Sequence, residues 1–159
     1  MISADELLVY CDAALDEYAA ICRELGDDLV SSRPDGLPSA NSAFALVTHV
    51  AGVMARWGRT VNRGIVVPRD RAAEFVATGT VEEALAVLEA ARARFHEDVA
   101  ATAFREPPAN PHADWPEPGY ETQGGILLHV YEELAQHLGQ LEVTRDLLVA
   151  HRGRADHAR

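Results

Sequence analysis

Residues 122–150, TQGGILLHVYEELAQHLGQLEVTRDLLVA, are the stretch that decides the fold. Thr122 is a suitable helix N-cap, and it precedes leucines that recur at helical spacing along one side, namely Leu128, Leu134, Leu138 and Leu141. The pattern predicts one long amphipathic helix over residues 122–150, followed by a frayed polar tail over residues 151–159.

Three more segments have the same helical spacing, and they cover residues 3–26, 41–64 and 80–101. Each segment starts at a residue that can cap a helix: Ser3, then Asn41 or Ser42, then Thr80. Glu83 completes a capping box with Thr80, and Gly26 and Gly64 are suitable helix stops. We therefore predict four long helices in this chain.

The connections between these helices are long, and residues 69–75 in the second connection are predicted to add a short helical turn. Five of the eight prolines lie between Pro107 and Pro118, so the third connection cannot be regular helix or a central strand. No hairpin signal or internal repeat is visible. The sequence thus predicts the all-α class, with residues 1–150 as a single four-helix bundle that has a crossover connection.

The charge balance limits the classes of partner. The formal net charge is -11 and the pI about 5.0, which disfavours binding to nucleic acid or to an anionic membrane. No apolar run is long enough for a membrane span, and the acidic start MISADELLVY differs from a signal peptide. These features predict a cytoplasmic protein. All 14 basic residues are arginine, which together with abundant alanine indicates a GC-rich bacterial genome.

The two cysteines, Cys11 and Cys22, fall in one predicted helix. Eleven residues of helix separate their Cα atoms by roughly 16 Å, which is too far for a disulfide. We expect buried thiols in a reducing compartment.

Residues that can bind a metal share one face of the last helix. His129, Glu133 and His137 are spaced four apart, whereas Glu132 points about 100° away from Glu133. A Glu133–His137 pair alone is a common structural feature, so a metal site needs a ligand from another helix. His49, within the apolar run ALVTHVAGV, is the candidate, although a lone histidine there also suits a core position. Imidazole and carboxylate together favour zinc, with nickel or ferrous iron as alternatives.

Two blocks carry a resemblance to a known family: LPSANSAFALVTHVAGVMARW at 37–57 and GGILLHVYEELAQHLGQLEVTRDLL at 124–148. Together they resemble the DinB-like superfamily, closest to its actinobacterial branch of mycothiol-dependent maleylpyruvate isomerases and related thiol-dependent transferases. The likeness spans roughly residues 5–150. It implies a four-helix bundle with a crossover and a divalent metal held by His49, Glu133 and His137. Glu133 stands where many members have histidine, as in the mycothiol-dependent branch.

The resemblance leaves the position of His129 open. His129 is either a neighbour of the ligands or a ligand itself, in a triad with His49 and His137 that Glu133 would orient. Arg145, Trp115 and Tyr120 are candidates for binding the thiol or its substrate. Each has a structural alternative: an ion pair with Glu142 or Glu121 for Arg145, and anchoring of the proline-rich loop for the two aromatic residues.

The leading functional hypothesis is a metal-dependent enzyme that uses mycothiol as nucleophile or cofactor in a transfer or isomerisation. No residue of this chain is assigned as catalytic. The alternatives are a non-catalytic metal-binding stress-response or sensor module, and a bundle without a metal in which His49 belongs to the core. A homodimer is common for small bundles, but no apolar stripe is surplus to the core. No P-loop or Rossmann glycine pattern indicates a nucleotide cofactor.

Overall fold

The computed structural model describes residues 2–37, 39–110 and 119–157, and within these ranges every regular element is a helix. Four helices are long: α1 (Ala4–Leu29), α2 (Ala43–Met54), α4 (Val81–Ala100) and α5 (Gln123–His157). The predicted all-α class is confirmed.

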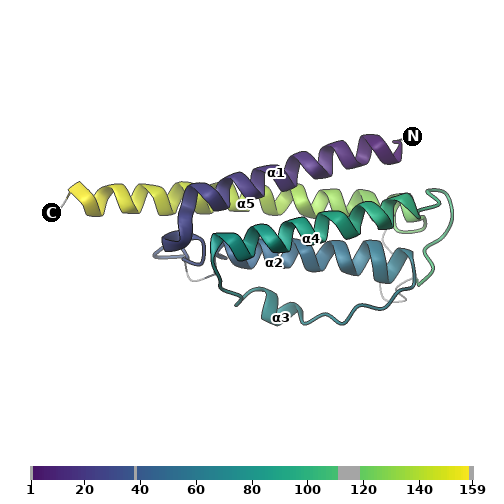
Figure 1. Cartoon of the computed structure of the whole chain (residues 1–159), viewed down its shortest axis with the longest axis horizontal. Coiled ribbons are helices and arrows are strands. Elements are labelled where there is room, and N and C mark those ends of the chain that lie inside the picture. Colours follow the sequence, from purple (N-terminus) through teal and green to yellow (C-terminus); the bar gives the residue numbers. More distant parts are fainter. Residues whose placement is uncertain (1, 38, 111–118, 158–159) are drawn as a thin grey trace.

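The four long helices form a bundle in which α1 and α2 each pack against both α4 and α5 (Figure 1). Helices α2 and α4 run in the same direction, so the chain between them returns along the length of the bundle. This crossover, residues 63–80, carries the short helix α3 (Arg71–Glu74), which packs on α2. The predicted short turn in residues 69–75 is thereby confirmed.

Most predicted helix starts are confirmed by their caps. Ser3 and Thr80 each form a capping box, and the Ser42 hydroxyl accepts a hydrogen bond from the Ala45 amide at 3.2 Å. These side chains satisfy amide groups that have no partner inside the helix. Thr122 caps α5 in the same way, since its hydroxyl accepts from the Gly125 amide at 3.1 Å.

Two helix ends differ from the prediction. Gly26 adopts a φ of 66° and breaks the regular conformation, but the chain resumes its turn and α1 ends at Leu29. Helix α5 continues to His157 instead of ending near Ala150. Arg152 in this extension lies 3.4 Å from the Asp28 carboxylate, which ties the last turns of α5 to the end of α1.

The sequence pattern predicted a regular second helix over residues 41–64, but in the structure this helix changes its type part of the way along. After Met54 it widens into the π-helix η1 (Ala55–Asn62), and Gly64 with a φ of 70° follows its end. Arg59 and Arg63 both reach the buried Asp98 of α4, at 3.1 and 2.7 Å. This paired ion cluster fastens η1 to α4.

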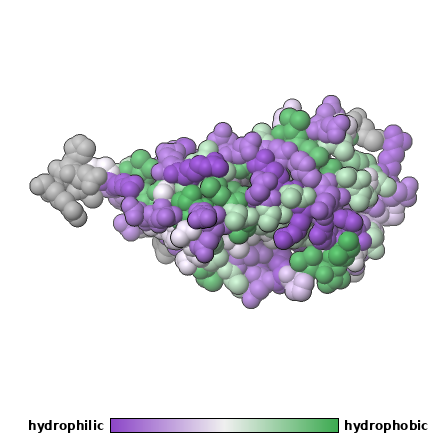
Figure 2. All heavy atoms as spheres, in the orientation of Figure 1, coloured by the Kyte–Doolittle hydropathy of each residue, from purple (hydrophilic) through white to green (hydrophobic). Residues whose placement is uncertain are grey.

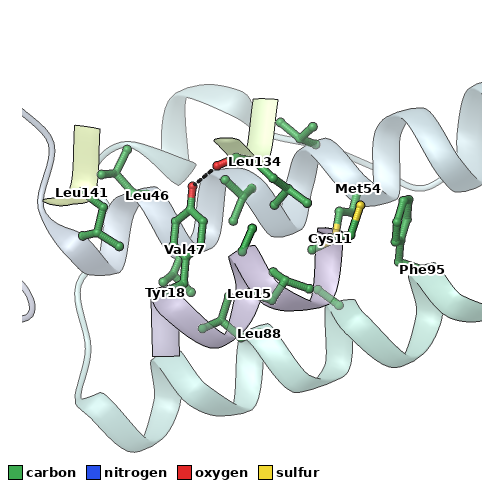
Figure 3. Packing of buried hydrophobic residues seen from close by; sticks show 14 of the residues in the cluster. Cys11, Leu15, Tyr18, Leu46, Val47, Met54, Leu88, Phe95, Leu134 and Leu141 are labelled. Atoms are coloured by element: carbon green, nitrogen blue, oxygen red, sulfur yellow. Dashed lines mark hydrogen bonds between the residues drawn. The ribbon is translucent and has the colours of Figure 1, made fainter. Parts of the chain in front are cut away.

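The core is a continuous apolar cluster contributed by all four long helices (Figure 3). Its largest fully buried side chain is Tyr18 of α1, whose hydroxyl donates to the Leu134 carbonyl of α5 at 3.0 Å. That bond satisfies the one polar atom of the ring and joins two helices that are far apart in sequence. Other fully buried residues include Leu7, Leu15, Leu46, Met54, Phe95 and Leu141.

Both cysteines are free and buried, as the helical spacing predicted. Burial, with a smaller contribution from the charge of Asp12, raises the pKa of Cys11 from its ordinary value of 9.0 to about 12. Burial likewise raises the pKa of Cys22 to about 11. Neither thiol is therefore a thiolate near neutral pH.

We expect neither thiol to react with Ellman's reagent in the folded protein, and both to react after unfolding in guanidinium chloride. Rapid reaction of a thiol in the folded protein would contradict this burial.

The free energy of unfolding should also fall as the pH rises from 9.0 to about 12, because the unfolded chain loses these thiol protons first.

The surface is largely hydrophilic on the face that Figure 2 shows, with apolar residues in separate patches among the hydrophilic ones. Within the described ranges, no helix combines the length and the apolar character that crossing a membrane requires.

Candidate metal centre

His49 lies in the middle of α2 and is buried, with 2% of its surface exposed. Its Nδ1 atom lies 2.9 Å from Oε2 of Glu74, and its ring stacks on Phe75 with the ring centroids 4.5 Å apart. An ionised carboxylate only accepts hydrogen bonds, so Nδ1 carries the proton and donates. The lone pair of His49 is then on Nε2, which points away from Glu74.

Glu133 and His137 lie one turn apart on α5 and face His49. Oε2 of Glu133 lies 3.3 Å from Nε2 of His137 and 3.9 Å from Nε2 of His49. Nδ1 of His137 donates to Oε1 of Gln140 at 3.1 Å, so His137 also turns its Nε2 towards the carboxylate. The rings of His49 and His137 meet edge to face with centroids 4.6 Å apart.

One ligand atom from each of these three residues therefore points into a common space. The three atoms all lie within 4.8 Å of one another. Ligand atoms around a tetrahedral zinc stand about 3.3 Å apart, so an ion between these side chains needs only a modest closing of the cluster. Two imidazole nitrogens and one carboxylate oxygen are the donor set of open zinc sites, and the residues present fit the metal.

The electrostatics of the cluster favour a positive charge beside the Glu133 carboxylate. The imidazoles of His137 and His49, which face the carboxylate, hold the pKa of Glu133 well below its usual range, although burial acts in the opposite direction. The Glu133 carboxylate in turn raises the pKa of His137. Without an ion, a proton on His137 compensates the half-buried carboxylate; a divalent cation compensates it more fully.

His129 lies at the edge of this cluster. Its Nε2 is 3.5 Å from Oε1 of Glu133, and its Nδ1 is 3.0 Å from the Tyr120 hydroxyl and 3.1 Å from the Glu132 carboxylate. The ring also meets Trp57 edge to face, at 4.9 Å between centroids. His129 thus lies against Oε1 of Glu133, whereas the ligand atoms that lie within 4.8 Å of one another are those of His49, Glu133 and His137.

The other predicted site residues are placed as follows. Tyr120 stacks on Trp57 at 5.7 Å between ring centroids and is within hydrogen-bonding distance of His129, so it reaches the edge of the cluster. Arg145 lies further along α5, where it pairs with Asp146 at 2.8 Å and Glu24 at 3.5 Å. Trp115 lies outside the described residues.

Sequence reasoning missed Glu74 and Arg69, which hold His49 on the side of the ring that faces away from Glu133. Glu74 is buried, and Arg69 binds both of its oxygens, at 2.6 and 2.9 Å. Burial acts to raise the pKa of Glu74, but the hydrogen bonds from Arg69 and His49 outweigh it, and the pKa is lowered. In the sequence, RDRAAEF indicates only a short helical turn, and nothing in it indicates a buried carboxylate.

The helical bundle, together with a cluster of histidine and carboxylate side chains between α2 and α5, is that of a DinB-like protein. The family model described as mycothiol-S-transferase matches residues 6–150, and the chain belongs to the mycothiol-S-transferase family. Comparison with curated proteins and with solved structures gave no match.

Proposed function

We propose that this protein is a divalent-metal-dependent transferase that uses mycothiol as its nucleophile. The observation that carries the proposal is the convergence of His49, Glu133 and His137 in a chain of this family. Zinc is the metal that this donor set favours, with nickel or ferrous iron as alternatives. When bound, the metal lowers the pKa of a coordinated thiol and keeps the sulfur in its reactive thiolate form.

The exposure of the three side chains supports access by a small molecule from one side. The side chain of His49 is 3% exposed, whereas those of His137 and Glu133 are 22% and 28% exposed. His49 therefore closes the inner side of the site, and α5 forms its outer wall. An open side is what distinguishes a catalytic metal site from a structural one.

Each residue has a distinct part in this proposal. His49 and His137 supply neutral nitrogen donors, and Glu133 supplies the negative charge that balances the ion. In the transfer, the sulfur of the thiol forms a bond to an electrophilic carbon and displaces its leaving group, while the thiol proton passes to solvent.

Tyr120, at the edge of the cluster, is proposed to contact the thiol or its substrate. The same role for Arg145 and Trp115 stays a prediction, as do the cytoplasmic location and a homodimer.

The test uses protein purified without chelator, whose metal content is measured by mass spectrometry. The zinc-loaded and metal-free forms are then incubated with mycothiol and a haloarene, and both thiol loss and halide release are followed. We expect acceleration only by the metal-loaded form. Equal rates for the two forms would overturn the transferase proposal, and glutathione in place of mycothiol tests selectivity for the thiol.

Tight stoichiometric zinc without any acceleration, for a panel of electrophiles, would instead favour the non-catalytic metal-binding module. Protein that purifies without metal and shows no thermal shift on addition of zinc would favour the bundle in which His49 is only a core residue.

A further inference from the structure

The crossover between α2 and α4 brings a carboxylate against the back of His49. Asp70 is the N-cap of helix α3, where its side chain accepts from the Ala73 amide at 3.0 Å, and the helix ends at Glu74. Glu74 is only 6% exposed, and its Oε2 receives the Nδ1 hydrogen of His49 at 2.9 Å. The next residue, Phe75, covers the face of the same imidazole. Two consecutive residues of the crossover thus fix the ring in two directions.

The carboxylate itself is held in place by α2 and Arg69. Arg69 donates a hydrogen bond to each oxygen of Glu74, so Oε2 accepts from both the guanidinium and His49. On α2, Gly52 lies one turn after His49, and a Cβ atom at this position would collide with Oε1 of Glu74. The absence of a side chain at Gly52 is therefore what allows the carboxylate to approach the helix.

We propose that Glu74, held by Arg69, is a positioning residue for the metal: it fixes the tautomer and the orientation of His49, so that Nε2 offers its lone pair to the site. A carboxylate behind a ligating histidine restricts the ring and increases its basicity, and removing such a partner weakens metal binding about 10- to 100-fold. This inference rests on the proposed function only in requiring that His49 binds a metal.

A structural alternative is that Glu74 and Arg69 are only a buried ion pair that fastens the crossover to α2. The two possibilities differ in what a neutral side chain at position 74 changes. An ion pair without a positioning role affects the stability of metal-free and metal-loaded protein alike, and it leaves the affinity for zinc unchanged. A positioning role lowers the affinity for zinc itself.

The experiment is a competition titration of zinc against a chromogenic chelator, with the metal-free protein of residues 1–159. Glu74→Gln keeps the size of the side chain, but only its carbonyl oxygen can accept a hydrogen bond, and its amide group cannot accept from Arg69. We expect the affinity of this variant for zinc to be about 10- to 100-fold weaker. Asp12→Asn is the matched control, because Asp12 also lies 2.9 Å from a histidine, His96, on other faces of the bundle. This control should bind zinc as tightly as the unmodified protein.

A second variant approaches the same contact from α2. Gly52→Ala retains Glu74 but places a methyl group where its carboxylate lies, so it should also weaken zinc binding, even though alanine favours a helix. Cobalt-loaded protein gives a readout of geometry: its visible spectrum should change in Glu74→Gln and stay the same in Asp12→Asn. Folding of every variant is checked by circular dichroism, and Gly52→Ala keeps the test decisive if Glu74→Gln does not fold.

The outcomes separate this inference from the proposed function. Unchanged zinc affinity in folded Glu74→Gln and in Gly52→Ala would overturn the positioning role, even if thiol transfer by the unmodified protein is demonstrated. Weaker zinc binding in both variants would support it, even if no thiol transfer is found. Absence of zinc binding by the unmodified protein would overturn both.

Discussion

Replacing Glu133 with glutamine should abolish stoichiometric zinc binding and leave the helical bundle folded. Glutamine has nearly the same shape, but it removes the negative charge that balances a divalent ion between two neutral imidazoles. Removing a ligand should weaken zinc binding more than removing a residue such as Glu74, which only supports a ligand. We therefore expect zinc affinity and thiol-transfer activity to fall by at least about 100-fold. Isothermal titration with zinc and an assay of thiol loss measure the two effects.

Glu142→Gln is the control for this substitution, because Glu142 is exposed on the same helix beyond the cluster. It makes the same change in net charge and should retain full zinc binding. If Glu133→Gln bound zinc as tightly as this control, Glu133 would not be a ligand, and the alternative set of His49, His129 and His137 would have to be tested with His129→Gln.

The second large effect concerns stability. Zinc that binds the folded chain and not the unfolded chain should stabilise it by about 2.7 kcal/mol at a free concentration of 100 times the dissociation constant. For a domain of this size, each kcal/mol shifts the midpoint of thermal unfolding by about 2–4 °C, so we expect an increase of roughly 5–11 °C. Differential scanning calorimetry with added zinc, and then with excess chelator, measures the increase and its reversal.

A variant with His49→Ala should show no such increase at the same zinc concentration, because the ligand from α2 is lost. Its metal-free form will also unfold at a lower temperature, since His49 is buried, so the comparison is the zinc-dependent shift within each variant. An equal shift in the variant and the unmodified protein would place the stabilising ion elsewhere.

Much of the fold followed from local signals in the sequence. Ser3 and Thr80 were recognisable as caps, and Ser42 as one of two candidates beside Asn41, because a hydroxyl before an apolar repeat satisfies free amides in almost any context. The widening of α2 into η1 was not recognisable, because its residues continue an ordinary helical pattern. It coincides with packing on α4, where Arg59 and Arg63 share Asp98, and this contact depends on the whole bundle.

The sequence indicated some residues of the candidate site but not all of them. Glu133 and His137 share a face by helical spacing alone, and His49 was singled out as a polar residue in an apolar helix. Glu74 could not be identified, because its role depends on how the crossover returns across α2 and on the space at Gly52. Neither the course of a loop nor a close approach between segments leaves a periodic signal.

The crossover also has a kinetic consequence. Helix α3 has only four residues, and its main packing partner is α2, so we expect this segment to open more often than the bundle unfolds. Each opening withdraws Glu74 from His49 and frees the imidazole to turn. The residence time of a bound ion would then follow the opening rate of a surface loop, and changes in that loop could adjust metal exchange while every ligand stays the same.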